Sequence, residues 1–136
     1  VGSDSNTSVS PVEELRWLEY GARLRLQKRA VLCTQEQSVG DYLYQGALHG
    51  GARAAGRKAG KIEVGYKADL IQLDHEHAMF AHGDISRLLD SWIFSGHSLV
   101  VQDVYVGGRQ QVRNGVHSLE QTSMQNYQHA LKTMLA

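Results

Sequence analysis

Residues 1–20 join a short polar loop to a strong start signal for a helix. Ser10 can cap the helix, Pro11 stands at its first position, where the missing N–H costs nothing, and Glu13 completes a Ser-x-x-Glu capping box. Asp4 lies in the loop, just after what we interpret as the end of a strand. Catalytic carboxylates of α/β enzymes lie in such loops, between a strand and a helix. Gly-Ser-Asp-Ser is also ordinary turn composition, so the pattern leaves Asp4 as either a turn residue or a catalyst.

The spacing of apolar residues predicts helices in the first part of the chain. A first helix is expected from Pro11 to about Arg29, with Glu19 and Arg23 paired on its more polar side and Arg16 at the surface, paired with Glu13 or Glu19. Its expected core stripe consists of Leu15, Leu18, Ala22 and Leu26, widened by Trp17, Tyr20 and Leu24. A second helix is expected from Val39 to about Gly50. A separate short helical turn, stopped by Gly56, should follow it.

The apolar pattern changes from a helical to a strand period at Gly60. Strands are expected at Lys61–Val64 and Ala68–Leu73, followed by a loop over residues 74–83. A helix capped by Asp84 and ended by Gly96 should come next. A hairpin should follow it, with a strand Leu99–Val106, a Gly107-Gly108 turn and a return strand Arg109–Arg113. After a turn at Asn114-Gly115, a final helix capped by Ser118 is expected, with an apolar stripe of Tyr127, Leu131, Met134 and Leu135.

Composition narrows the classes of partner. Lys plus Arg and Asp plus Glu both number 14, so the net charge is near zero, which argues against a nucleic-acid partner. No apolar run is long enough to span a membrane, and we expect no membrane partner. Cys33 is the only cysteine, which excludes an intramolecular disulfide and favours a cytoplasmic protein. The Gly-rich run near residue 51 lacks the Gly-Lys-Ser/Thr of a phosphate-binding loop.

Three segments carry a resemblance to a known family. Gly2-Ser3-Asp4-Ser5, followed by Glu-Glu-Leu-Arg-Trp-Leu-Glu-Tyr-Gly at residues 13–21, resembles the eighth-strand region of the formimidoylglutamate deiminase family. Gly60-Lys-Ile-Glu-Val-Gly-Tyr-Lys-Ala-Asp-Leu-Ile71 is similar to a segment that many members of the amidohydrolase superfamily share. Residues 103–109 and 112–115 resemble the closing hairpin of the small β-domain in that superfamily.

This resemblance implies a fold and an activity. The fold would belong to the α/β class, as the C-terminal fragment of a metal-dependent (β/α)₈ barrel hydrolase with part of its small β-sandwich domain. Locally, the fragment would consist of helices plus a small antiparallel sheet. Residues 1–59 would hold the end of the last barrel strand, the catalytic loop and the following helices. Residues 60–117, including a helix at 84–95, would form part of the β-domain, and 118–136 a C-terminal helix. A whole barrel needs about 250 residues and this chain has 136, so we expect a fragment.

The implied reaction is hydrolysis of the formimino C–N bond of N-formimidoyl-L-glutamate to N-formylglutamate and ammonia, in histidine degradation. Zn²⁺ in the complete enzyme would activate a water molecule. Asp4 is the implied metal ligand and catalytic residue, and Ser3, Ser5 and Asn6 could orient its carboxylate. The fragment alone should be inactive, because the other metal ligands of the family come from earlier strands.

Three alternatives remain open on the sequence. His75 and His77 form a His-x-His pair which, with Asp74 and His82, could bind a metal within this chain, although a solvated loop explains them equally. The parent could be another deaminase of the amidohydrolase superfamily that acts on a different small molecule. Alternatively, the chain could be a non-catalytic module. In every case the uncovered apolar stripe of the first helix favours a homo-oligomer.

Overall fold

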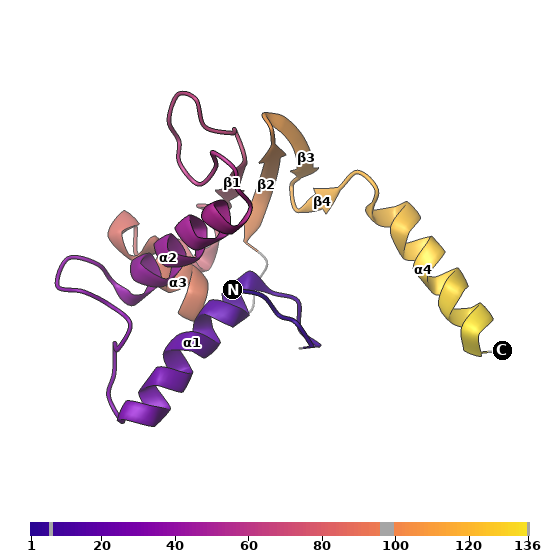
Figure 1. The fold of residues 1–136 in the computed structure, drawn as a ribbon. Helices are drawn as coiled ribbons and strands as arrows, with labels where there is room; N and C mark the ends of the chain where they lie inside the picture. Colours follow the sequence, from indigo (N-terminus) through magenta and orange to yellow (C-terminus); the bar gives the residue numbers. More distant parts are fainter. Residues whose placement is uncertain (6, 96–99, 136) are drawn as a thin grey trace. The chain divides into compact units, whose positions relative to one another are not determined.

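The computed structural model describes residues 1–5, 7–95 and 100–135 (Figure 1). They fall into two compact units. The first unit comprises the described residues of 1–66 and 75–98, and the second those of 67–74 and 99–136. The described elements are helices and one small antiparallel sheet, which confirms the local part of the fold prediction. The division at residues 59/60 and 117/118 refers to an intact enzyme and stays a prediction.

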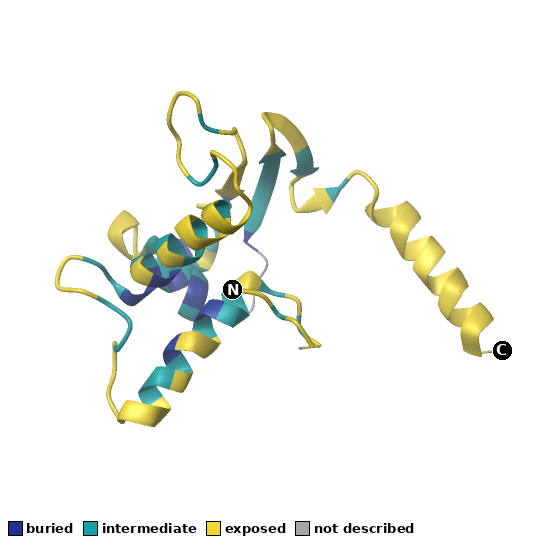
Figure 2. Cartoon of the chain, viewed as in Figure 1, coloured by how far each residue is buried: buried dark blue, intermediate teal, exposed yellow. Residues whose placement is uncertain are grey.

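Three helices build the first unit: α1 (Pro11–Leu26), α2 (Val39–Ala54) and α3 (Leu88–Phe94). Short 3₁₀ turns at Ala78–Phe80 and Ile85–Arg87 precede α3. The buried core of the unit consists of Leu15, Val39, Leu43 and Ile93, with Val12, Leu32, Cys33, Tyr44, Ala47 and Phe94 packed around it. Figure 2 shows that the buried residues of this unit gather where the helices face one another.

The start of α1 follows the prediction and its end does not. Ser10 is the N-cap, and its hydroxyl accepts a hydrogen bond from the N–H of Glu13 at 3.4 Å. The helix ends at Leu26 because Gln27 takes a left-handed conformation, with φ of 51°. The predicted end at about Arg29 was therefore too late.

The buried face of α1 also differs from the predicted stripe. Leu15 and Glu19 are buried, whereas Leu18 and Leu26 are about half exposed, at 48% and 47%. Trp17, expected in the core, is 61% exposed. The predicted Glu19–Arg23 pair is present, but the Glu19 side chain is fully buried and does not lie on a polar surface. The spacing of apolar residues cannot predict the burial of Glu19. A carboxylate can be buried when hydrogen bonds satisfy its oxygens, and these bonds leave no mark in the apolar pattern.

The second helix is longer than predicted. α2 runs without a break from Val39 to Ala54, because residues 52–54 (Ala-Arg-Ala) are good helix formers that outweigh the preceding glycines. It ends where Gly56 adopts a φ of +62° and donates its N–H to the carbonyl of Arg53 at 3.2 Å. Gly56 therefore stops the helix as predicted, but no separate helical turn precedes it.

Asp84 begins the next helical segment as predicted. Its carboxylate accepts a hydrogen bond from the N–H of Ser86 at 3.0 Å. The segment starts as a 3₁₀ turn and becomes α-helical only at Leu88. The predicted stop at Gly96 lies outside the described residues.

The second unit is built on a four-stranded antiparallel sheet in the order β1-β2-β3-β4. The strands are β1 (Leu70–Leu73), β2 (Val101–Val106), β3 (Arg109–Arg113) and β4 (Val116–His117). The predicted Gly107-Gly108 turn joins β2 to β3, and both glycines have positive φ, as a two-residue hairpin turn of this type requires. The predicted start of β2 at Leu99 lies outside the described residues.

The predicted strand at Lys61–Val64 is wrong. The segment is irregular, and the N–H of Tyr66 closes a turn to the carbonyl of Glu63 at 3.0 Å. Ile62 and Val64 are 91% and 100% exposed. Strand propensity cannot form a strand without a partner to receive its backbone hydrogen bonds, and no described strand pairs with this segment.

The chain ends in α4 (Glu120–Leu135), which has no buried residue in its described length and is drawn as exposed throughout in Figure 2. The helix starts at Glu120, whose carboxylate accepts from the N–H of His117 at 3.3 Å. The residue directly before the helix is therefore Leu119, not the predicted cap Ser118, and the His117 ring accepts the N–H of Leu119 at 3.1 Å. None of the helices in the described part of the chain has the length and apolar character that a membrane crossing requires.

Candidate functional site

The loop that carries Asp4 is a turn held at one end by the start of α1. Asp4 and Ser5 form the turn, and Asp4 has a φ of 43° in the left-handed region, which aspartate tolerates better than most residues. The carboxylate bends back toward Gly2: a Cβ atom added there would lie 3.9 Å from Oδ1 of Asp4. Asp4 is exposed, and its side chain is therefore accessible to a substrate or an ion.

Two serines fix the junction between this loop and α1. Besides the cap made by Ser10, the hydroxyl of Ser8 donates a hydrogen bond to the carboxylate of Glu13. Of the residues expected to orient Asp4, Ser3 is half-buried and Ser5 is exposed, and Asn6 lies outside the described residues. The orienting role of the loop serines stays a prediction.

A cavity of about 310 Å³ lies beside the loop, between it and the first two helices. Its volume falls at the lower end of the range for small-molecule sites, about 300–1,000 Å³. The lining residues are Val1, Gly2, Ser3, Val9, Ser10, Pro11, Glu14, Leu15, Tyr44, Ala47, Leu48 and Gly51. Asp4 is not among them, although Gly2 and Ser3 are. Burial raises the pKa of the Tyr44 phenol, which therefore stays neutral at pH 7.

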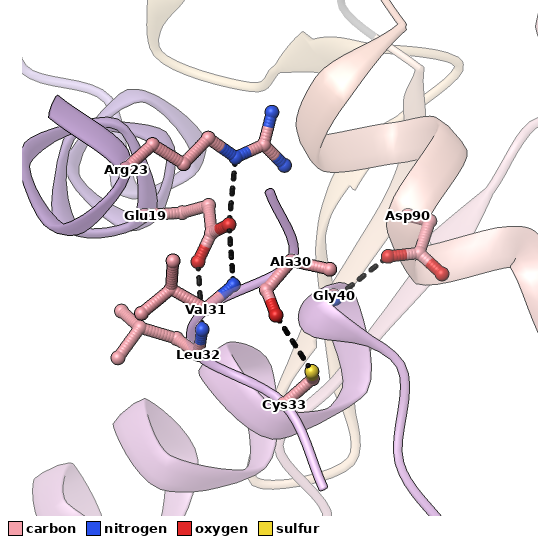
Figure 3. A network of polar contacts seen from close by, with 8 residues as sticks. All are labelled: Glu19, Arg23, Ala30, Val31, Leu32, Cys33, Gly40 and Asp90. Atoms are coloured by element: carbon pink, nitrogen blue, oxygen red, sulfur yellow. Dashed lines mark hydrogen bonds and ion pairs between the residues drawn. The ribbon is translucent and has the colours of Figure 1, made fainter. Parts of the chain in front are cut away.

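A buried carboxylate ties α1 to the connection that leads to α2 (Figure 3). Oε1 of Glu19 accepts from Nε of Arg23 at 2.7 Å and from the N–H of Val31 at 3.0 Å, and Oε2 accepts from the N–H of Leu32 at 2.9 Å. Burial opposes ionisation of Glu19 most strongly, but the hydrogen bonds from Arg23, Leu32 and Val31, with the charge of Arg23, together hold its pKa below its ordinary value. Glu19 is thus a structural anion rather than a free catalytic base.

Two further bonds clamp the helices together. Nε of Arg16 donates to the carbonyl of Ile93 at 2.7 Å, and the N–H of Gly40 donates to Oδ1 of Asp90 at 2.7 Å. The expected surface pair of Arg16 with Glu13 or Glu19 is therefore replaced, in part, by a contact with α3. These bonds hold α1 and α2 against α3, and the Asp4 loop leads directly into α1.

Two of the histidines of residues 75–82, His77 and His82, serve as local caps. Nδ1 of His77 accepts from the N–H of Met79 at 3.2 Å, and Nδ1 of His82 accepts from the N–H of Asp84 at 3.0 Å. Nε2 of His82 lies 2.9 Å from the hydroxyl of Ser91. Nδ1 of each of these two rings accepts a backbone N–H, so a metal could bind this nitrogen only by displacing that hydrogen bond. His97 lies outside the described residues.

The described residues do not by themselves fit a catalytic zinc ion. Within 1–5, 7–95 and 100–135, no group of three His, Cys, Asp or Glu side chains is placed to hold a metal. A catalytic zinc site commonly has three protein ligands and an open position for water. Asp4 would supply one of them, so further ligands would have to come from residues other than those described.

The sequence analysis proposed the loop of Asp4, whose role stays a prediction, and it missed two features of the same unit. The burial of Glu19 has no signal in the apolar pattern, since its partners are backbone N–H groups. A basic hollow at residues 49–66 also went unrecognised, although the run Gly-Arg-Lys-Ala-Gly-Lys at 56–61 could have indicated it.

The chain is similar to known proteins of one family. Residues 1–110 match the model of the amidohydrolase family. The chain is 45% identical over 136 residues to a formimidoylglutamate deiminase of Pseudomonas aeruginosa, a match that covers 99% of this chain and 30% of that protein. A crystal structure of an amidohydrolase from Brucella melitensis superposes with a TM-score of 0.85 at 39% identity, again over 99% of this chain and 30% of the other. The chain thus spans about 30% of the length of these relatives.

Proposed function

From the premise that the chain belongs to the amidohydrolase family, we propose that it is the C-terminal part of a hydrolase acting on C–N bonds. The proposed substrate is N-formimidoyl-L-glutamate, and the products are N-formylglutamate and ammonia. The observation that carries this proposal is the 45% identity, over the whole chain, to a formimidoylglutamate deiminase. The complete protein would have the barrel and the small β-domain expected from the sequence.

Asp4 is the residue of this chain that we assign to the chemistry. Its carboxylate is accessible, on a turn anchored to α1. In the proposed reaction, water adds to the formimino carbon and transfers a proton to Asp4. Asp4 then returns this proton to the departing nitrogen, and the proton of the added hydroxyl follows by the same route as the carbonyl of the formyl group forms. The C–N bond breaks and the nitrogen, which has received both protons of the water, leaves as ammonia. A positioned carboxylate that moves a proton in this way contributes typically 10²–10⁴-fold to a rate.

The family's metal would activate the water, and we propose zinc. Because the described residues contribute at most Asp4 to such a site, the remaining ligands are assigned to the parts of the parent protein that this chain does not span. It follows that the isolated chain should release no ammonia from N-formimidoyl-L-glutamate. The single Cys33 fits the cytoplasm, the compartment we propose for a degradative enzyme of this kind.

A hybrid enzyme tests the assignment. Residues 1–136 would replace the matching 30% of the P. aeruginosa deiminase, and ammonia release from N-formimidoyl-L-glutamate would be measured. We expect an active hybrid, and Asp4→Asn should lower kcat/KM by at least about 10²-fold. Glu36→Gln removes a carboxylate on an exposed part of the same unit and should leave kcat/KM unchanged.

Two outcomes would count against the proposal. A folded hybrid that releases no ammonia would indicate a different substrate or a non-catalytic module. Full activity in the Asp4→Asn hybrid would remove Asp4 from the chemistry, even if the substrate assignment held.

A further inference from the structure

A second hollow, remote in sequence from Asp4, has a basic lining. It lies at the C-terminal end of α2 and in the segment that follows, and its volume is about 400 Å³. Its cationic lining residues are Arg53, Arg57, Lys58 and Lys61. The other lining residues are His49, Ala52, Gly56, Ala59 and Tyr66, and none of them is acidic.

The positive charge of this hollow is largely uncompensated. In the part of the chain that the structure describes, Lys61 alone of the four cations has an ion pair: its Nζ lies 3.9 Å from a carboxylate oxygen of Glu63. Both side chains of that pair are about half exposed, at 49% and 59%, so it contributes little. The C-terminus of α2 supplies a dipole equivalent to roughly −0.5 charge, which offsets only a small part of four positive charges. The hollow therefore keeps a positive potential.

Specific backbone geometry brings the cations together. Gly56 turns the chain at φ +62°, and the N–H of Arg57 returns to the carbonyl of Ala52 at 3.2 Å. Gly60 then approaches α2 closely: a Cβ added there would lie 3.2 Å from Cγ of Leu48. These two contacts fold residues 56–60 back beside the end of α2. The hollow is thus formed by the fold and is not only a run of charged residues in a flexible loop.

An aromatic ring holds the last cation in place. Nζ of Lys61 lies 5.5 Å from the centre of the Tyr66 ring, a cation–π distance. Tyr66 is half-buried and lines the hollow. This contact holds the ammonium group of Lys61 at one wall of the hollow. No carboxylate lines the other walls.

We propose that this hollow binds a small oxyanion that carries at least two negative charges, as phosphate-bearing and polycarboxylate compounds do. Guanidinium groups match the geometry of phosphate and carboxylate oxygens, and lysine adds point charge. The volume suits a small molecule. A nucleic acid would require a basic stripe extending over the surface, whereas the chain as a whole has no net charge.

Titration of the chain with sodium pyrophosphate, and separately with citrate, tests this site. At about 0.01 M ionic strength, screening extends to roughly 30 Å and leaves the attraction intact. We expect saturable one-to-one binding by calorimetry of at least one of the two anions. Amide chemical shifts in ¹H–¹⁵N spectra should change mainly within residues 49–66. A stronger response to pyrophosphate would assign a phosphate ligand, and a stronger response to citrate a polycarboxylate.

A matched pair of variants separates a site from general surface charge. Arg53→Gln/Arg57→Gln should weaken binding at least about tenfold, because two charge-assisted contacts are lost. Arg25→Gln/Arg29→Gln removes the same charge from exposed positions elsewhere in the unit and should leave the affinity within about twofold. The proposal is overturned if neither anion binds saturably, if both variants lose affinity equally, or if only a single-stranded oligonucleotide binds.

Discussion

The N–H of Gly40 donates to the carboxylate of Asp90 at 2.7 Å, and the Cα of Gly40 faces the backbone of α3. A Cβ atom at this position would lie 2.5 Å from the backbone nitrogen of Asp90 and 2.6 Å from the carbonyl carbon of Leu89. Real Cβ atoms do not approach backbone so closely, and the first turn of α2 can contact α3 only through a glycine. The contact of these two helices therefore depends on one residue without a side chain.

Gly40→Ala should therefore destabilise the first unit. The added methyl group forces the two helices apart, at a cost of about 1–3 kcal/mol or more in the free energy of unfolding, measured by urea denaturation. Gly46→Ala is the matched control in the same helix, because a Cβ there has nothing within 4 Å. It should stabilise the chain by about 0.5–1 kcal/mol. Equal effects of the two substitutions would contradict the close approach.

Glu19→Gln should cost about 1–3 kcal/mol of stability, although it preserves the shape of the side chain. The glutamine carbonyl can replace only one carboxylate oxygen, so its NH₂ group would face an N–H donor, that of Leu32 or that of Val31. Urea unfolding at pH 7 measures the loss. Glu36→Gln, at an exposed position of the connection between α1 and α2, should change the free energy of unfolding by less than about 0.5 kcal/mol.

The contribution of Glu19 should depend on pH with a definite sign. Its folded-state pKa lies below its ordinary value of 4.5, so the folded state favours the ionised form. The extra stability is fully present above pH 4.5 and is lost as the pH falls through the folded-state pKa. The difference in urea midpoint between the parent chain and Glu19→Gln should therefore shrink between about pH 7 and pH 3. A difference that grows on acidification would show that the sign is wrong.

The sequence predicted the elements whose signals are local. Ser10 before Pro11, Gly56 after α2, and the Gly107-Gly108 turn each determine the backbone through their own side chain or lack of one. The predictions failed where tertiary partners decide. Ile62 and Val64 have strand propensity but no described partner strand, and remain exposed.

The candidate site also has features that the sequence indicates locally and features that depend on tertiary contacts. Asp4 could be proposed from the sequence because a motif of a few adjacent residues carries it. The hydrogen bonds of Glu19 to residues 31 and 32, and the approach of Gly40 to α3, join residues that are far apart in the sequence. No periodicity records such contacts. The role of Asp4 itself depends on ligands that the described residues do not include, and it stays a proposal.

The His75/His77 pair should not form a zinc site in this chain. His77 uses its Nδ1 to cap the 3₁₀ turn at Ala78–Phe80, and zinc would have to displace that bond. We expect the double variant His75→Ala/His77→Ala to bind added zinc as weakly as the parent chain in a calorimetric titration. A clear drop in zinc affinity would favour the His-x-His metal site over the capping role.

The isolated chain should associate with a second copy of itself through α1. The outward side of this helix exposes Trp17 at 61%, Leu18 at 48% and Leu24 at 78%. Burying each such side chain is worth roughly 1.5–3 kcal/mol, and monomeric proteins rarely leave so many neighbouring apolar groups uncovered. Light scattering at micromolar concentration should give a mass above the 15.1 kDa of one chain.

Charged substitutions locate the contact. Trp17→Lys/Leu24→Lys should shift the mass toward a monomer, because burial in a contact would desolvate both ammonium groups. Met134→Lys/Leu135→Lys is the control, since it alters a comparable area on α4, where these residues are 82% and 79% exposed. If the α4 variant becomes monomeric while the α1 variant does not, the contact lies on α4. A parent chain that is monomeric from the start would exclude self-association and leave the α1 face to another partner.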